Sequence, residues 1–190
     1  MFVSLPSRTK PSLRWATPML VGLLWLAFLW ASTQTDAAQN ALLQDWGALT
    51  GGTGPLDSVR ALWTEGRALR LISALFLHAD WAHLLGNLVF LLIFGFPAER
   101  VMGPWRFLLL FLLGGAVANL AAVLAIGAPQ RLVIGASGAV SAVIGAYLAL
   151  FPRAKLGVVL PLGLFLEFVR APASLLIGIW ALLQVVFAYI

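Results

Sequence analysis

Five stretches of the chain are almost wholly apolar, and more polar stretches of various lengths separate them. Runs of roughly 20 apolar residues have the length that an α-helix needs to cross a bilayer. The pattern therefore predicts an all-α membrane protein, a polytopic helical bundle with about five transmembrane helices. We expect the spans at about residues 16–32, 81–98, 105–126, 137–151 and 173–190.

The polar stretches complete this layout. Residues 1–15 are basic, and we expect them to precede a single transmembrane domain at residues 16–190. Residues 33–80 form a long loop with amphipathic pieces, such as "ALLQDWGAL", that predict short helices at the membrane interface. Asp80 stands just before the second span, where it can cap the helix. Residues 153–172 predict a half-amphipathic connection.

The first apolar run follows a basic start, which is also the arrangement of a secretory signal peptide. The run is longer than the usual apolar region of such a peptide, and no clear cleavage site stands out from Ala31 onwards. A retained first transmembrane helix is therefore the preferred interpretation.

Composition supports a membrane protein. Hydrophobic residues make up 62% of the 190 residues and charged residues only 10%, whereas soluble domains carry about 25% charged residues. The net charge of +5 therefore indicates basic cytoplasmic loops rather than a nucleic-acid partner. The chain has no cysteine, which excludes disulfides and thiol chemistry.

The distribution of Lys and Arg predicts the orientation. With the N-terminus in the cytoplasm, most cations fall in inner segments, as the positive-inside rule requires. We therefore expect a multi-pass protein of a bacterial inner membrane whose loop 33–80 faces outward. The inner cations are Arg8, Lys10, Arg14, Arg100, Arg106, Arg153, Lys155 and Arg170, and the outer ones are Arg60, Arg67, Arg70 and Arg131.

Polar side chains at membrane depth mark the candidate chemistry, because they are costly there unless they face the bundle interior or water. His83 and Asn87 lie four residues apart on one face of the second span, and His78 precedes that span. Ser137 begins the fourth span, in "VIGASGAVSAVIGAY", at the same predicted outer boundary. A hydroxyl, two imidazoles and a carboxamide are the groups that acyl transfer needs.

Each group also has a simpler interpretation. Ser137 and Ser141 can serve packing alone, and His83 with Asn87 can form an interhelical hydrogen-bond pair. Two histidines five residues apart are poor helical metal ligands, and no Cys or acid cluster completes a zinc site. We therefore expect no metal.

Small residues fill the rest of the fourth span. Two stripes repeat every four residues, and such spacing lets a helix pack closely against its neighbours on several sides. The span has only about 15 residues, which leaves room for water above Ser137. The stripes are Gly138, Ala142 and Ala146, and Ser141, Gly145 and Ala149.

These motifs, in this order, resemble the rhomboid family of intramembrane serine proteases over about residues 60–190. The similar stretches are "RLISALFLH", "HADWAHLLGN", the Glu-x-x-x-Gly of "ERVMG", "GASGAVSAVIGAY" and a late "AP…W..LQ". They contain Arg70, His78, His83, Asn87, Glu99, Gly103, Gly135, Ser137, Gly138 and Gly145.

The resemblance implies a six-helix core in which Ser137 is the nucleophile. It implies that His83, Asn87 and the backbone N–H of the serine form the oxyanion hole, with His78, Gly135 and Gly138 beside them. Arg70, Glu99, Gly103 and Gly145 are then structural. The expected substrates are transmembrane segments of other membrane proteins, cut near the outer face without a metal or organic cofactor, and the lipid bilayer is the remaining partner.

Three positions depart from the family pattern. Ser141 and Leu69 stand where the family commonly has aromatic residues. The family's general base is a His on a sixth helix, for which this sequence has no counterpart. A serine needs a base to act as a nucleophile at neutral pH. We therefore expect a C-terminally incomplete chain that is inactive alone.

Two other functions remain open. The missing base also suits a catalytically inactive rhomboid-like protein that binds transmembrane clients. The third candidate, a small transporter subunit, is disfavoured because Glu99 and Glu167 fall at boundaries rather than inside the spans.

Overall fold

The computed structural model describes residues 14–50, 55–64, 66–126, 131–162 and 165–189. Within these ranges the chain is mainly helical, as expected, and every predicted apolar segment forms a helix. These five helices are α1 (Ala16–Ser32), α5 (Trp81–Met102), α6 (Pro104–Ala125), α7 (Ser137–Leu150) and α8 (Ala173–Tyr189).

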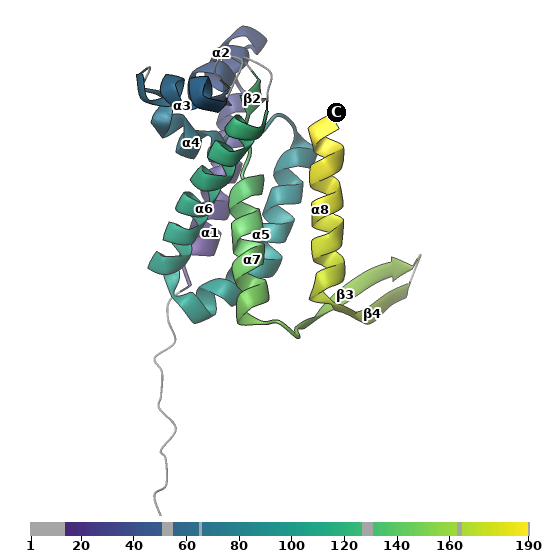
Figure 1. The fold of residues 1–190 in the computed structure, drawn as a ribbon. Helices are drawn as coiled ribbons and strands as arrows, with labels where there is room; N and C mark the ends of the chain where they lie inside the picture. Colours follow the sequence, from purple (N-terminus) through teal and green to yellow (C-terminus); the bar gives the residue numbers. More distant parts are fainter. Residues whose placement is uncertain (1–13, 51–54, 65, 127–130, 163–164, 190) are drawn as a thin grey trace, which may run out of the picture.

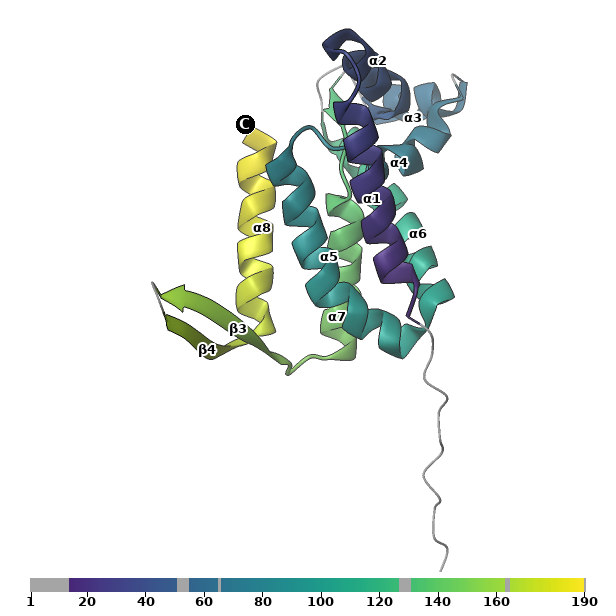
Figure 2. The same ribbon diagram turned by 180° about the vertical axis from the view of Figure 1, so that it is seen from behind.

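The helices run alongside one another, with α7 between α5 and α6 (Figure 1). The reverse view shows α1 packed across α5 and α6 (Figure 2). Helices α5 and α6 each have 22 residues and enough apolar character to cross a membrane, while α1, α7 and α8 are shorter apolar helices. The fold is therefore a helical membrane bundle, and the full number of spans stays a prediction.

Short elements cover the end of the bundle where α7 begins, here called the serine end (Figure 1). A two-residue antiparallel pairing of β1 with β2 ties two of the loops there. These elements are α2 (Asp36–Trp46), β1 (Ala48–Leu49), α3 (Pro55–Thr64), 3-10 helix η1 (Arg67–Leu69), α4 (Arg70–Ser73), 3-10 helix η2 (Ala74–Phe76) and β2 (Leu132–Val133). Helix α2 contains most of the amphipathic piece "ALLQDWGAL", whose last two residues form β1, and α3 is a second short helix in this loop.

An antiparallel hairpin lies at the opposite end, here called the hairpin end (Figure 1). Its strands are β3 (Lys155–Leu162) and β4 (Phe165–Pro172), with Lys155 opposite Pro172. A half-amphipathic connection was predicted for residues 153–172, and the two strands there differ from that expectation. Val and Phe residues favour extended backbone, and Pro161 cannot donate the hydrogen bond that a helix interior needs.

The link between α5 and α6 is shorter than predicted. We expected the second span to end near residue 98, but α5 continues through Pro97 to Met102. Gly103 alone then turns the chain, with a φ of +81° that a side chain would strain. Pro104 begins α6 at once, because its fixed φ suits the first turn of a helix.

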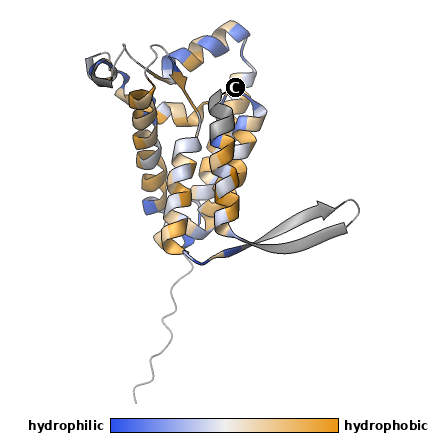
Figure 3. Ribbon diagram, turned by 45° about the vertical axis from the view of Figure 1, so that its right-hand side comes forward, coloured by the Kyte–Doolittle hydropathy of each residue, from blue (hydrophilic) through white to orange (hydrophobic). Residues whose placement is uncertain are grey.

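Hydrophilic residues gather toward the two ends of the bundle (Figure 3), and aromatic pairs also lie at both ends. Trp15 packs edge-on against Trp105 at the hairpin end, with ring centroids 4.9 Å apart. Trp81 packs in the same way against Trp25 and Phe28 at the serine end, at 5.4 and 4.7 Å. Such aromatic belts are typical of membrane–water interfaces.

Small residues bring α6 and α7 together. A Cβ at Gly138 would lie 2.5 Å from the Cβ of Ala118, and one at Gly115 would lie 2.9 Å from that of Ala139. Gly114 likewise faces Ala142 without room for a side chain. The stripe containing Gly138 and Ala142 therefore packs closely, as predicted, and its partners on α6 are Ala118 and Gly114.

Candidate active site

Ser137 is the first residue of α7, and its side chain is half-buried. The preceding residue, Ala136, is fully buried and forms the N-cap position without a side-chain cap. The free backbone N–H groups and the positive end of the helix dipole therefore lie where Ser137 begins the helix, and both favour negative charge. This is a suitable place for an oxyanion.

Gly135, in the short segment between β2 and α7, brings the backbone against an imidazole. Its φ is +106°, and a Cβ built on it would lie 2.5 Å from both Cε1 and Nε2 of His83. Its backbone N–H donates to the Ala74 carbonyl over 2.8 Å, which fixes it from the other side. Only glycine fits here, because both the backbone conformation and the neighbouring ring exclude a side chain.

His78 contacts the next peptide. Its Nε2 accepts a long hydrogen bond of 3.4 Å from the backbone N–H of Ala136. The side chain is 3% exposed, and burial, followed by the charge of His83, lowers the pKa of His78 from 6.5 to about 3. His78 is therefore neutral near pH 7, which is the state in which Nε2 can accept.

His83 and Asn87 lie one turn apart on α5, as the sequence predicted. The backbone N–H of His83 donates to Oδ1 of Asp80 over 2.8 Å, which confirms Asp80 as the helix cap. Nδ2 of Asn87 donates to the His83 carbonyl over 2.9 Å. Asn87 is 1% exposed, and its Oδ1 has no hydrogen-bond partner in the described part of the chain.

The two imidazoles are neighbours. The ring centroids of His78 and His83 are 5.0 Å apart, with the rings inclined at 64°. The peptide segment that leads into Ser137 thus contacts both histidines, because Gly135 lies against His83 and the N–H of Ala136 donates to His78. Buried polar groups with incomplete bonding, such as Asn87, are characteristic of functional sites.

Among the described residues, no three His, Asp or Glu side chains come together as metal ligands usually do. The polar groups at this end of the bundle are the Ser137 hydroxyl, two imidazoles, the Asn87 carboxamide and the N–H groups at the start of α7.

Glu99 and Arg70 each hold two elements together. The Glu99 carboxylate is fully buried and accepts the backbone N–H groups of Ala16 (2.8 Å) and Thr17 (2.9 Å), so it caps α1 from α5. Nη1 of Arg70 donates to the Gln44 carbonyl over 2.8 Å and ties α4 to α2.

Gly145 does not show the close packing expected of it. A Cβ there would meet no heavy atom within 4 Å in the described structure. Ser141 and Ala149, in the same stripe, are exposed. The helical period places these residues on one face, but only tertiary structure decides whether another helix covers that face.

Two polar contacts were not anticipated. Asn119, 4% exposed in α6, donates from Nδ2 to the Leu71 carbonyl over 2.9 Å and supports the segment before His78. Nε1 of Trp180 in α8 donates to Oγ of Ser141 over 3.0 Å. The asparagine inside an otherwise apolar span was the available signal for the first contact.

Comparison with known proteins places these residues in a family. A model of the rhomboid domain matches residues 65–190, which include both histidines, Asn87 and Ser137. "RHOMBOID-like protein 5" of Arabidopsis thaliana is 34% identical over 90 residues, which are 47% of this chain and 29% of that protein. "Rhomboid-related protein 2" of Mus musculus is 37% identical over 101 residues, 52% and 33% of the two chains.

A bacterial protein gives a similar match. "Putative rhomboid protease YdcA" of Bacillus subtilis is 36% identical over 85 residues, which cover 44% of this chain and 42% of that one. The matched part of the chain thus spans less than half of each of these curated relatives, and no solved structure matches it. On the strength of the match over residues 65–190, the chain belongs to the rhomboid family.

Proposed function

We propose that the protein is an intramembrane serine endopeptidase that cleaves transmembrane segments of other membrane proteins. The observation that carries this proposal is the position of Ser137 at the start of α7, preceded by two peptides that contact His83 and His78. Family membership supports it, because a relative from Bacillus subtilis bears the name of a rhomboid protease.

In the proposed reaction, Oγ of Ser137 attacks the scissile carbonyl carbon and its proton passes to a base. The carbonyl oxygen becomes an oxyanion, which the Ser137 backbone N–H, a ring N–H of His83 and Nδ2 of Asn87 stabilise. Collapse of this intermediate breaks the peptide bond, and the amine leaves with a proton. Water then hydrolyses the acyl-enzyme and regenerates Ser137.

His78 is poorly suited to be the base. Its Nε2 already accepts the Ala136 N–H, and its pKa of about 3 makes it a weak proton acceptor at neutral pH. We assign His78 instead to positioning the peptide that leads into Ser137.

We place the serine end at the outer membrane face, with the N-terminus in the cytoplasm. The excess of Lys and Arg in the segments at the hairpin end supports this orientation. Substrate would then be cut near the outer face. A helical substrate must unwind locally to present a carbonyl, so residues of low helix propensity should favour cleavage.

The test is cleavage of a reporter transmembrane substrate by the full-length protein in membranes. Ser137→Ala should abolish cleavage, and the matched Ser141→Ala variant, one turn along the same helix, should retain it. A fluorophosphonate probe should label the parent protein but not Ser137→Ala. Undiminished cleavage by Ser137→Ala would contradict the proposal. Substrate capture without cleavage or labelling in the parent protein would favour an inactive client-binding role.

A further inference from the structure

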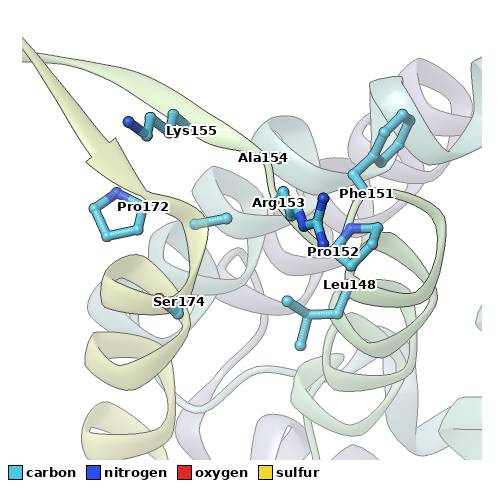
Figure 4. A pocket seen from close by; sticks show the side chains of 9 residues that line it. Leu148, Phe151, Pro152, Arg153, Ala154, Lys155, Pro172 and Ser174 are labelled. Carbon is cyan, nitrogen blue, oxygen red and sulfur yellow. The ribbon is translucent and has the colours of Figure 1, made fainter.

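A second polar feature lies at the other end of the bundle from Ser137. A cavity of about 140 Å³ opens where α7 ends and α8 begins, beside the base of the hairpin (Figure 4). Arg153, Lys155 and Ser174 supply its polar wall, and Leu148, Phe151 and Pro172 are part of its apolar wall. None of the catalytic candidates reaches it.

The charged side chains that line this cavity are positive. Two of its lining side chains are cations, and no carboxylate is among the described residues that line it. Both Arg153 and Lys155 are exposed, so a ligand can reach them from outside the bundle. Two cationic side chains among the lining residues favour a phosphate, which Arg can bind through paired hydrogen bonds.

The apolar wall favours a phospholipid over a free phosphate ion as the ligand. Leu148 is 37% exposed and Leu175, one residue beyond Ser174, is 55% exposed, so apolar surface continues outward from the cavity along α7 and α8. A free phosphate ion would use only the cations. A phospholipid would use both surfaces, with its headgroup at the cations and its acyl chains along the helices.

The level of the cavity fits a lipid headgroup. It lies at the hairpin end, the same end at which Trp15 and Trp105 form an interfacial aromatic pair. Basic pockets between transmembrane helices at the membrane surface are suited to anionic lipid headgroups. We propose that this cavity binds an anionic phospholipid of the leaflet at the hairpin end, with its phosphate on Arg153 and Lys155. The bound lipid would bridge α7 and α8, and its binding does not depend on the chemistry of Ser137.

Lipid binding to the full chain in detergent, followed by native mass spectrometry, tests the proposal. The probes are phosphatidylglycerol and phosphatidylcholine with identical acyl chains. The parent protein should bind phosphatidylglycerol at least several-fold more tightly. The double variant Arg153→Ala with Lys155→Ala should lower that affinity about 10- to 30-fold, since each cation contributes a few-fold.

Two further double variants distinguish binding at this cavity from general attraction of anionic lipid to a basic surface. Arg100→Ala with Arg106→Ala removes two exposed cations from the same end of the bundle, and it should change the affinity less than about 2-fold. Arg153→Lys with Lys155→Arg keeps both charges and should retain binding. This swap also keeps the proposal testable if the alanine pair fails to fold, as judged by circular dichroism.

Several results would overturn the proposal. Equal binding of the two lipids by the parent protein would exclude a headgroup site. Equal weakening by both alanine pairs would indicate diffuse attraction to a basic surface. Loss of binding in the charge-conserving swap would exclude a site based on these two charges. Displacement of phosphatidylglycerol by an equal concentration of inorganic phosphate would show that the cavity binds the phosphate alone, without the acyl chains.

Discussion

The backbone of Gly135 lies directly against the imidazole of His83, so closely that a Cβ would lie 2.5 Å from two of its ring atoms. This contact joins the residue two before Ser137 to the second span and sets the distance between α5 and the start of α7. The glycine of the serine motif is therefore a spacer between two proposed parts of the reaction centre.

Gly135→Ala should lower the rate of cleavage strongly and the stability of the fold only slightly. The new methyl group must displace His83, and φ of +106° strains any L-residue at a cost of about 1–2 kcal/mol. Loss of an oxyanion donor typically lowers the rate about 10²- to 10³-fold. We expect a fall of that size in reporter cleavage with a modest decrease in Tm.

The matched control is Gly86→Ala, three residues after His83 in α5. A Cβ at Gly86 meets nothing within 4 Å in the described structure, so this variant should keep activity and gain about 0.5–1 kcal/mol of helix stability. Wild-type cleavage by Gly135→Ala would contradict the spacer role.

His78→Phe should act through the Ala136 peptide. The substitution removes the acceptor of the Ala136 N–H, and a buried unpaired donor costs about 1–3 kcal/mol. We expect kcat to fall more than KM changes, because the N-terminus of α7 moves while the substrate-binding surface stays. His78→Gln, which keeps an acceptor, should recover part of kcat. Equal kcat for both variants would show that the hydrogen bond is irrelevant.

Stability should depend on pH through His78. The pKa of His78 is about 3 in the folded protein and returns to the ordinary histidine value of 6.5 on unfolding. Between pH 3 and 6.5, His78 is therefore protonated in the unfolded chain and neutral in the folded protein. The contribution to stability is therefore complete above pH 6.5 and is lost as the pH falls toward 3. The slope reaches about 1.4 kcal/mol per pH unit.

Thermal unfolding in detergent between pH 4 and 8 measures this dependence. Tm of the parent protein should fall on acidification, and His78→Gln should flatten the curve between pH 4 and 6.5. His83→Gln serves as the comparison, because it removes the other histidine and its charge. An unchanged slope in His78→Gln would show that other groups carry the dependence.

Glu99→Ala should destabilise the packing of α1. The buried carboxylate accepts two backbone N–H groups at the start of that helix, and hydrogen bonds to charged groups contribute about 1.5–3 kcal/mol. We expect Tm to fall by several degrees, with a smaller loss in Glu99→Gln, which keeps one acceptor. Arg100→Ala, an exposed neighbour, is the control, and a loss of the same size there would argue against the cap.

Much of this architecture could be predicted from local pattern. Apolar runs long enough for a bilayer become helices, and the four-residue spacing of His83 and Asn87 fixes their common face. Asp80 was identifiable as a cap because a short acidic side chain precedes an apolar run. The approach of Gly138 to α6 followed from small residues at helical spacing.

Other features depend on contacts between distant segments. The hairpin and the single-residue turn at Gly103 reflect how neighbouring elements meet. The hydrogen bond from Asn119 to the Leu71 carbonyl and the open space at Gly145 depend on which helix faces each residue. Sequence period identifies a face but not its neighbour, and for this reason the partners of these residues were not foreseen.

The loop before Ser137 is anchored to a segment far upstream. Thr50 donates its backbone N–H to the Arg131 carbonyl over 2.9 Å and accepts the Arg131 N–H at Oγ1 over 2.8 Å, across a separation of 81 residues. Contacts of such high sequence separation tend to form late, because closing the long loop between them costs conformational entropy. A newly made chain would thus bring Ser137 into its proposed reaction centre only near the end of folding, and partly folded chains would carry an unassembled centre.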